Sequence, residues 1–175
     1  APKAVADPNE KKYIYMKVVG GEIAAAAALA PKCAPVGLPP KKVGEDIQKA
    51  TLQWKGIKIF VEIMVQNRVC FVTVLPTASP LILKALKEPP RDRKKTKNVV
   101  HNGKLKMSDV VDIAKQVRHK SYSTDFVGTV LEVLGTCVSI GCTVDGESPK
   151  SIQAKIKAGE IEVNNEHETL QIELE

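Results

Sequence analysis

Aromatic residues are scarce in this chain, where Phe, Trp and Tyr make up 4% of 175 residues. Proteins that bind single-stranded nucleic acid on an RNA-recognition motif or an oligonucleotide-binding barrel stack bases on exposed rings. With three Phe, three Tyr and one Trp, the chain has few rings for that purpose. The composition therefore disfavours these two folds.

Long apolar runs and closely spaced cysteines are also lacking. The apolar run at residues 24–30 is far too short to cross a bilayer, and no signal-peptide core is found. The opening Ala-Pro-Lys reads as though an initiator Met had been removed, which favours a cytoplasmic protein. The four cysteines lack zinc-knuckle spacing, so we expect reduced thiols and no metal. They are Cys33, Cys70, Cys137 and Cys142.

Catalytic signatures are absent as well. The sequence contains no Walker loop, dinucleotide fingerprint or HExxH motif, and no plausible Ser/His/Asp or Cys/His set. The pair Gly20-Gly21 lacks the other glycines of a phosphate-binding loop. Because an active site needs converging groups, we expect no enzyme activity, no cofactor and no small-molecule substrate.

What the chain does have is an uneven charge. The formal net charge is +6, but residues 76–125 hold 12 basic and 5 acidic side chains, whereas residues 126–175 hold 3 and 9. An unspecialised solvated surface mixes the two signs more evenly. The basic middle of the chain therefore indicates an anionic partner.

The first part of the chain predicts a small α/β domain over residues 12–86, after a flexible tail at 1–11. Residues 13–19 suit a strand, and residues 57–65 alternate apolar and polar side chains with period two. A turn at Gln66-Asn67 leads into another strand at 69–75, which makes a hairpin. One helix is expected after Pro39-Pro40 and a short one at 81–86.

Residues 87–104 are expected to form a basic hinge and loop. The segment KEPPRDRKKTK at 87–97 holds six basic and two acidic groups together with two prolines, a composition that does not pack into a core. On charge alone, a solvated linker without a ligand is an equally good interpretation.

Residues 105–160 predict an all-helical domain, followed by an acidic tail at 161–175. Ser148-Pro149 is typical of a helix start, and Gly159 of a helix end. The fold class is therefore α+β: a domain with an antiparallel-containing sheet and helices on one side, a Pro-containing basic hinge, and an all-α domain.

The helix expected at 126–142, FVGTVLEVLGTCVSIGC, has an unusual outer face. At 100° per residue, Val127, Val130, Leu134, Cys137, Val138 and Gly141 share the core side. The opposite side holds Gly128, Glu132, Gly135, Thr136 and Ser139. A glycine inside a helix costs about 1 kcal/mol relative to alanine, so two of them on a solvated face require a compensating gain.

Close approach of another surface is the expected gain. Glycines and short hydroxyls suit the shallow minor groove of RNA, with its ribose hydroxyls. Tight packing against another helix, in a protein dimer or from the same chain, is an equally good interpretation on geometry alone. The neighbouring cluster Arg118-His119-Lys120 and the basic hinge favour RNA, since both can neutralise phosphates.

Three segments resemble one known family, the stalk-base protein of the large ribosomal subunit (the eleventh protein of the bacterial large subunit, the twelfth in eukaryotic naming). The run Gly135-Thr-Cys-Val-Ser-Ile-Gly141 is similar to the family's Gly-Thr-Ala-x-Ser-x-Gly signature, and residues 88–95 resemble its eukaryotic hinge. Residues 29–46 resemble its proline-rich segment and following helix. The resemblance covers residues 8–163.

The resemblance implies a structural protein of the large subunit whose helical domain binds the ribosomal RNA of the GTPase-associated centre. It implies an N-terminal domain that lies beside the stalk-anchoring protein and acidic stalk proteins and meets translation elongation factors transiently. Carried over by position, the RNA-facing residues are Gly135, Thr136, Ser139 and Gly141, with Arg91, Arg93, Lys94, Lys95 and Lys97 in the hinge. The segment facing RNA and factors contains Pro31, Pro35 and Gly37.

The chain departs from the family pattern at Ala34, where a glycine is usual before the proline. A positive φ at this position would strain an alanine. Two functions remain open: the ribosomal protein just described, and an RNA-binding regulator outside the ribosome.

Overall fold

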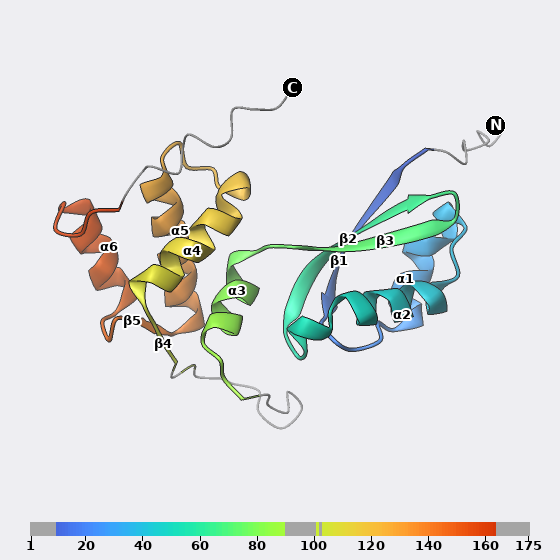
Figure 1. The fold of residues 1–175 in the computed structure, drawn as a ribbon, viewed down its shortest axis with the longest axis horizontal. Helices are drawn as coiled ribbons and strands as arrows, with labels where there is room; N and C mark the ends of the chain where they lie inside the picture. Colours follow the sequence, from blue (N-terminus) through green and yellow to red (C-terminus); the bar gives the residue numbers. More distant parts are fainter. Residues whose placement is uncertain (1–9, 90–100, 102, 164–175) are drawn as a thin grey trace. The chain divides into compact units, whose positions relative to one another are not determined.

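The computed structural model describes residues 10–89, 101 and 103–163. The chain divides into two compact units, residues 1–75 and 76–175, which are described separately below. Figure 1 shows the strands of the first unit and the helices of the second.

The first unit is built on a three-stranded antiparallel sheet in the order β1-β2-β3. In its register Met16 pairs with Val61, and Ile63 pairs with Val72. The hairpin turn consists of Asn67 and Arg68, both with positive φ, as a two-residue turn between twisted strands requires. The strands are Lys12–Val19 (β1), Lys58–Gln66 (β2) and Val69–Leu75 (β3).

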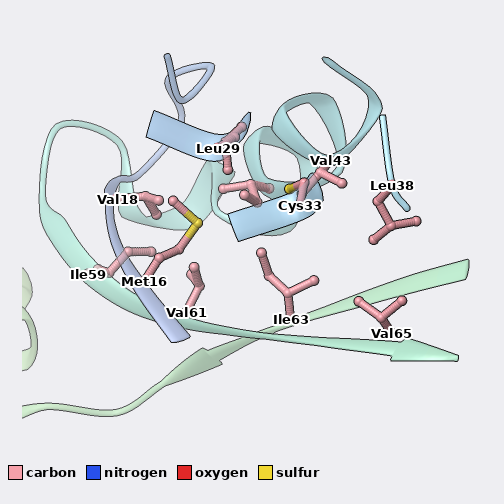
Figure 2. Packing of buried hydrophobic residues seen from close by; sticks show 11 residues of the cluster. Met16, Val18, Leu29, Cys33, Leu38, Val43, Ile59, Val61, Ile63 and Val65 are labelled. Atoms are coloured by element: carbon pink, nitrogen blue, oxygen red, sulfur yellow. The ribbon is translucent and has the colours of Figure 1, made fainter. Parts of the chain in front are cut away.

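Helices cover one face of this sheet, because every second strand residue is apolar and buried there. Figure 2 shows Leu29, Cys33 and Val43 from the helices packed against Met16, Val18 and the alternate residues of β2. This arrangement confirms the predicted antiparallel sheet with helices on one side. The helices are α1 (Ala26–Cys33), η1 (Ala34–Val36), α2 (Pro40–Ala50) and η2 (Leu52–Trp54).

The second unit is helical and centres on α5, which packs against three other helices. Its α-helices are α3 (Ala78–Ala85), α4 (Met107–Val117), α5 (Phe126–Ile140) and α6 (Pro149–Lys157), with a short 3-10 turn η3 (Arg118–Lys120). The sequence pattern missed a short parallel strand pair, β4 (Lys104–Leu105) with β5 (Thr143–Val144). This pair fixes the chain before α4 to the chain after α5.

The helix at α3 belongs to the second unit, whereas the sequence placed it in the first domain, with a boundary after residue 86. Pro80, Leu81 and Ile82 are its buried residues, and the helix packs on α4 and α5. A local pattern shows that these residues form a helix with an apolar face, but not which core that face joins. The basic part of the predicted hinge, residues 90–100, lies outside the described residues.

Candidate nucleic-acid interface

The buried side of α5 forms the core of the second unit. It includes Val130, Leu134 and Cys137, each fully buried, as the sequence predicted. The rest of the prediction for this face is partly wrong: Phe126, Thr129 and Val133 are buried, while Val127 and Val138 are half-buried and Gly141 is exposed. The buried face is thus rotated toward Val133 because α3 and α4 also pack on this side.

The outward side of α5 carries small and short polar residues, as expected. Glu132, Gly135 and Ser139 are exposed and Thr136 is half-buried. A Cβ added at Gly135 would have one neighbour within 4 Å, the Gln153 Nε2 atom at 3.7 Å, which is an ordinary contact. Packing among the described residues therefore gives no reason for a glycine at this position.

Gly128 does not belong to this open face, contrary to the sequence analysis. A Cβ at Gly128 would collide with the side chain of Ser123, in the loop that precedes α5. The Ser123 hydroxyl donates to the Asp125 carbonyl oxygen at 2.8 Å, so the loop is held close to the first turn of the helix. Packing inside the unit therefore explains why residue 128 is a glycine. It does not explain the glycine at position 135.

Gly141 ends α5 in the left-handed conformation, with φ of 87°. Its amide donates to the Cys137 carbonyl oxygen at 2.9 Å, and the Cys142 amide donates to the same oxygen at 3.3 Å. Glycine is the residue that adopts this cap at low cost. The fold thus accounts for Gly141, whose predicted RNA contact stays a prediction.

The loop between α4 and α5 carries the predicted cluster Arg118-His119-Lys120. Arg118 uses two guanidinium nitrogens within the protein, donating to the Ser123 carbonyl at 2.8 Å and the Thr124 carbonyl at 2.7 Å. His119 and Lys120 are exposed. Arg118 therefore shapes the loop, while the other two side chains present their polar groups to solvent.

A hollow of about 210 Å³ lies beside the exposed face of α5. Its apolar lining comes from α3, α4 and α5 and from the chain that enters α3. Its polar lining comes from α5, from the loop before it and from Thr77. The residues are Pro76, Thr77, Ala78, Val117, Lys120, Ser121, Glu132, Val133 and Thr136.

A relay of hydrogen bonds fixes Glu132 at this hollow. The Ser121 hydroxyl donates to Glu132 Oε2 at 2.9 Å. The same Ser121 oxygen accepts from the Thr129 hydroxyl at 2.9 Å and from the Ser123 amide at 3.1 Å. These bonds hold Glu132 Oε2 against Ser121. Among the described residues, Glu132 Oε1 has no hydrogen-bond partner.

The predicted hinge cations Arg91, Arg93, Lys94, Lys95 and Lys97 lie outside the described residues. The described residues that border this segment are paired across it. His101 Nδ1 lies 2.6 Å from Glu88 Oε2, with the side chains 10% and 26% exposed. Gly103 lies so close to Leu86 that an added Cβ would collide with it. The chain therefore leaves and re-enters the second unit at one place.

The proline segment predicted to face RNA and factors lies in the first unit and is exposed at Pro31, Pro35 and Gly37. Pro31 is inside α1, and Gly37 has a φ of 68°. Ala34 replaces the glycine that is usual in the family, and a positive φ would have strained it. Its φ is −56°, an ordinary helical value. The loop therefore tolerates alanine at this position without strain.

The thiols are shielded. All four cysteines are free, and Cys33, Cys137 and Cys142 are buried. Burial raises the pKa of the Cys137 thiol to about 12. Burial, with a hydrogen bond to Asp46, raises the pKa of Cys70 to about 11. Within the described residues no group of three His, Cys, Asp or Glu side chains is arranged to hold a metal ion, and none of the helices is long and apolar enough to span a bilayer.

Sequence reasoning missed the hollow and the role of Ser121. The only available signal was Glu132, an acidic residue on a face expected to meet RNA. The hollow is formed by residues from 76 to 136, and their proximity arises from the docking of α3 on α5.

Comparison with known proteins gives two family matches. The family described as "Ribosomal protein L11, RNA binding domain" matches residues 74–144, and "Ribosomal protein L11, N-terminal domain" matches residues 14–69. The chain is 57% identical over 160 residues to the large ribosomal subunit protein uL11 of Neurospora crassa, covering 91% of this chain and 97% of that protein. It is 55% identical to uL11 of Dictyostelium discoideum and 54% identical to uL11A of Saccharomyces cerevisiae, each over 157 residues, 90% of this chain and 95% of the other.

Proposed function

The chain belongs to the ribosomal protein L11 family, and from this premise we propose that it is a non-catalytic structural constituent of the large ribosomal subunit. In this proposal its second unit binds the ribosomal RNA of the GTPase-associated centre at the stalk base. Its first unit supports the action of translation factors during protein synthesis, in the cytoplasm.

The observation that carries the RNA-binding part is the exposed face of α5. Gly135 has space around it that the fold does not use, and Ser139 is exposed next to it along the helix surface. This face lies within residues 74–144, the part of the chain that matches an RNA-binding domain. A surface with short side chains lets RNA backbone and ribose hydroxyls approach the helix closely.

Positive charge beside this face supports the same assignment. His119 and Lys120 are exposed on the loop that precedes α5. The hinge residues Arg91, Arg93, Lys94, Lys95 and Lys97 would add phosphate contacts next to the groove contacts of α5. Arg118 contributes by holding the loop through its bonds to the Ser123 and Thr124 carbonyls.

The proposed protein partners belong to the first unit. The exposed segment with Pro31, Pro35 and Gly37 would face RNA and elongation factors, and the same unit would lie beside the stalk-anchoring protein and acidic stalk proteins. Support comes from exposure and from the match of residues 14–69 to the family's N-terminal domain.

Sedimentation of cell extracts tests the ribosomal assignment. We expect near-stoichiometric recovery of the protein with large subunits in high-salt gradients. Recovery only in the soluble fractions, with RNA binding retained in vitro, would instead identify a regulator that acts outside the ribosome.

The salt dependence of RNA binding tests the hinge. Neutralising a hinge base, for example Lys95→Gln, is expected to lower affinity for a transcript of the GTPase-associated centre. It should also reduce the slope of log K against log salt by roughly 0.7–0.9 per lost phosphate contact. Lys49→Gln in α2 is the matched control, because it removes an exposed lysine from the other unit. If the two variants share the wild-type slope, the hinge is only a spacer.

A further inference from the structure

Glu132 is out of place on a surface that binds RNA, because a carboxylate repels phosphates. Its charge is exposed, and its carboxylate accepts from a neutral hydroxyl, that of Ser121. A hydrogen-bond donor on the RNA that meets this carboxylate would offset the repulsion.

The site around Glu132 is built rather than accidental. The Ser121 oxygen makes three hydrogen bonds, two accepted and one donated, and together they hold Glu132 Oε2 in place. This leaves Oε1 as an acceptor at the hollow. Thr136 donates its hydroxyl proton to the Glu132 carbonyl at 3.2 Å, so its oxygen also offers acceptor capacity.

The hollow has the size and the lining for one planar ring. Its volume of about 210 Å³ lies below the range of about 300–1,000 Å³ that is common for pockets of drug-sized ligands. Pro76, Ala78, Val117 and Val133 supply apolar surface for the ring faces, whereas Glu132 and Thr136 supply polar atoms at its edge. Lys120 provides a cation for a phosphate of the same nucleotide.

We infer that the hollow beside α5 accepts one unstacked nucleobase with an amino group, namely adenine, cytosine or guanine, from the RNA that α5 contacts. The amino group donates to Glu132 Oε1, as amino groups of bases do to carboxylates in sequence-specific recognition. Uracil is disfavoured because its one N–H donor lies between two carbonyl oxygens, which a carboxylate repels. Single bases taken out of the stack are a common target of proteins that read RNA.

This inference rests on the proposed function and assigns Glu132 as a specificity-determining residue of the same surface. The two possible roles of Glu132 predict opposite changes in RNA affinity when the residue is replaced. If Glu132 acted through charge alone, removing it would strengthen binding to RNA. If it accepts a hydrogen bond from a base, removing it weakens binding.

The experiment uses the full chain and a transcript of the GTPase-associated centre of a eukaryotic large-subunit RNA. The Ser121 oxygen already accepts two hydrogen bonds, so in Glu132→Gln the amide oxygen stays with the Ser121 hydroxyl and the NH2 group faces the base amino group, donor against donor. This variant is expected to bind about ten-fold more weakly than wild type, the effect of losing one good base contact. Glu132→Asp keeps the charge but shortens the side chain by one methylene, and is expected to lose affinity as well. Glu160→Gln is the matched control, since it removes an exposed acid of the same unit away from the hollow, and should bind at least as tightly as wild type.

Chemical probing identifies the base. Dimethyl sulfate reports on the pairing edges of adenine and cytosine, and kethoxal on that of guanine. We expect one nucleotide to be protected by the wild-type protein and to become reactive again with Glu132→Gln, while the other protections remain. Circular dichroism confirms that each variant is folded.

Two results would overturn the inference. In one, Glu132→Gln binds RNA as tightly as wild type or more tightly. In the other, the same RNA bases are protected by wild type and by Glu132→Gln. In both cases the proposed RNA-binding function still stands if wild type binds the transcript. Absence of wild-type binding would instead contradict the proposed function itself.

Discussion

Replacing Gly135 by alanine is expected to stabilise the protein and at the same time to weaken its binding to RNA. The position is inside α5, where alanine is favoured over glycine by about 1 kcal/mol. The added Cβ would make an ordinary contact of 3.7 Å with Gln153 Nε2. The hydrogen bond from that Gln153 nitrogen to the Leu131 carbonyl, 2.9 Å long, can be kept.

The size of the stability effect follows from these numbers. For a unit of this length, 1 kcal/mol corresponds to a rise in Tm of about 4–8 °C. On the binding side, a methyl group forced into a tightly packed contact costs about 1–3 kcal/mol, which is roughly five-fold to more than a hundred-fold in Kd. A longer residue, as in Gly135→Gln, should weaken RNA binding further while the fold survives.

Thermal unfolding and filter binding to the ribosomal RNA transcript measure the two effects. Gly128→Ala is the control: its Cβ collides with Ser123, so this variant should lose stability. If Gly135→Ala binds RNA with unchanged affinity, RNA does not closely contact the exposed face of α5 at this position. A fall in Tm for Gly135→Ala would contradict the open space that the structure shows around Gly135.

Three further predictions concern groups away from the α5 surface. Alkylation of Cys137 at pH 8 should require unfolding, because burial raises the pKa of its thiol to about 12; labelling of the native protein at the rate of a free thiol would contradict this. Lys155 lowers the pKa of Glu147 through a hydrogen bond, so the pair contributes stability above the unfolded-state pKa that disappears as the pH falls through the lower folded-state value. The difference in Tm between wild type and Lys155→Met should therefore shrink in acid, and a constant difference would be inconsistent with the pair. His101→Ala should lower the unfolding free energy by about 1 kcal/mol in urea titrations, since the Glu88 carboxylate loses a partner at 2.6 Å, and an unchanged value would make the pair irrelevant to stability.

Much of the fold could be predicted from local patterns. The alternation at 57–65 fixes which face of β2 is buried, and Ser148-Pro149 marks the start of α6 at the residue the structure has. These predictions succeed because backbone periodicity and turn preferences depend on neighbours along the chain. The exposure of Gly135 was predicted for the same reason.

The candidate site was predicted only in part. Gly128 and Gly135 look equivalent on a helical wheel, yet one meets the Ser123 loop and the other faces open space. Arg118 reads as a phosphate ligand in sequence, but its guanidinium holds the carbonyls of the following loop. Such differences arise from the path of a loop, which no periodicity describes.

Residues close together along the chain were enough to predict β1, β2 and β3, most of the helices, the small-residue face of α5 and the family resemblance, but not α1 or the β4–β5 pair. Three features became visible only in the folded chain: the core that α3 joins, the glycine that has open space around it, and the contact of Ser121 with Glu132 beside a hollow. These depend on contacts between segments distant in sequence, whose geometry is set by how the helices pack.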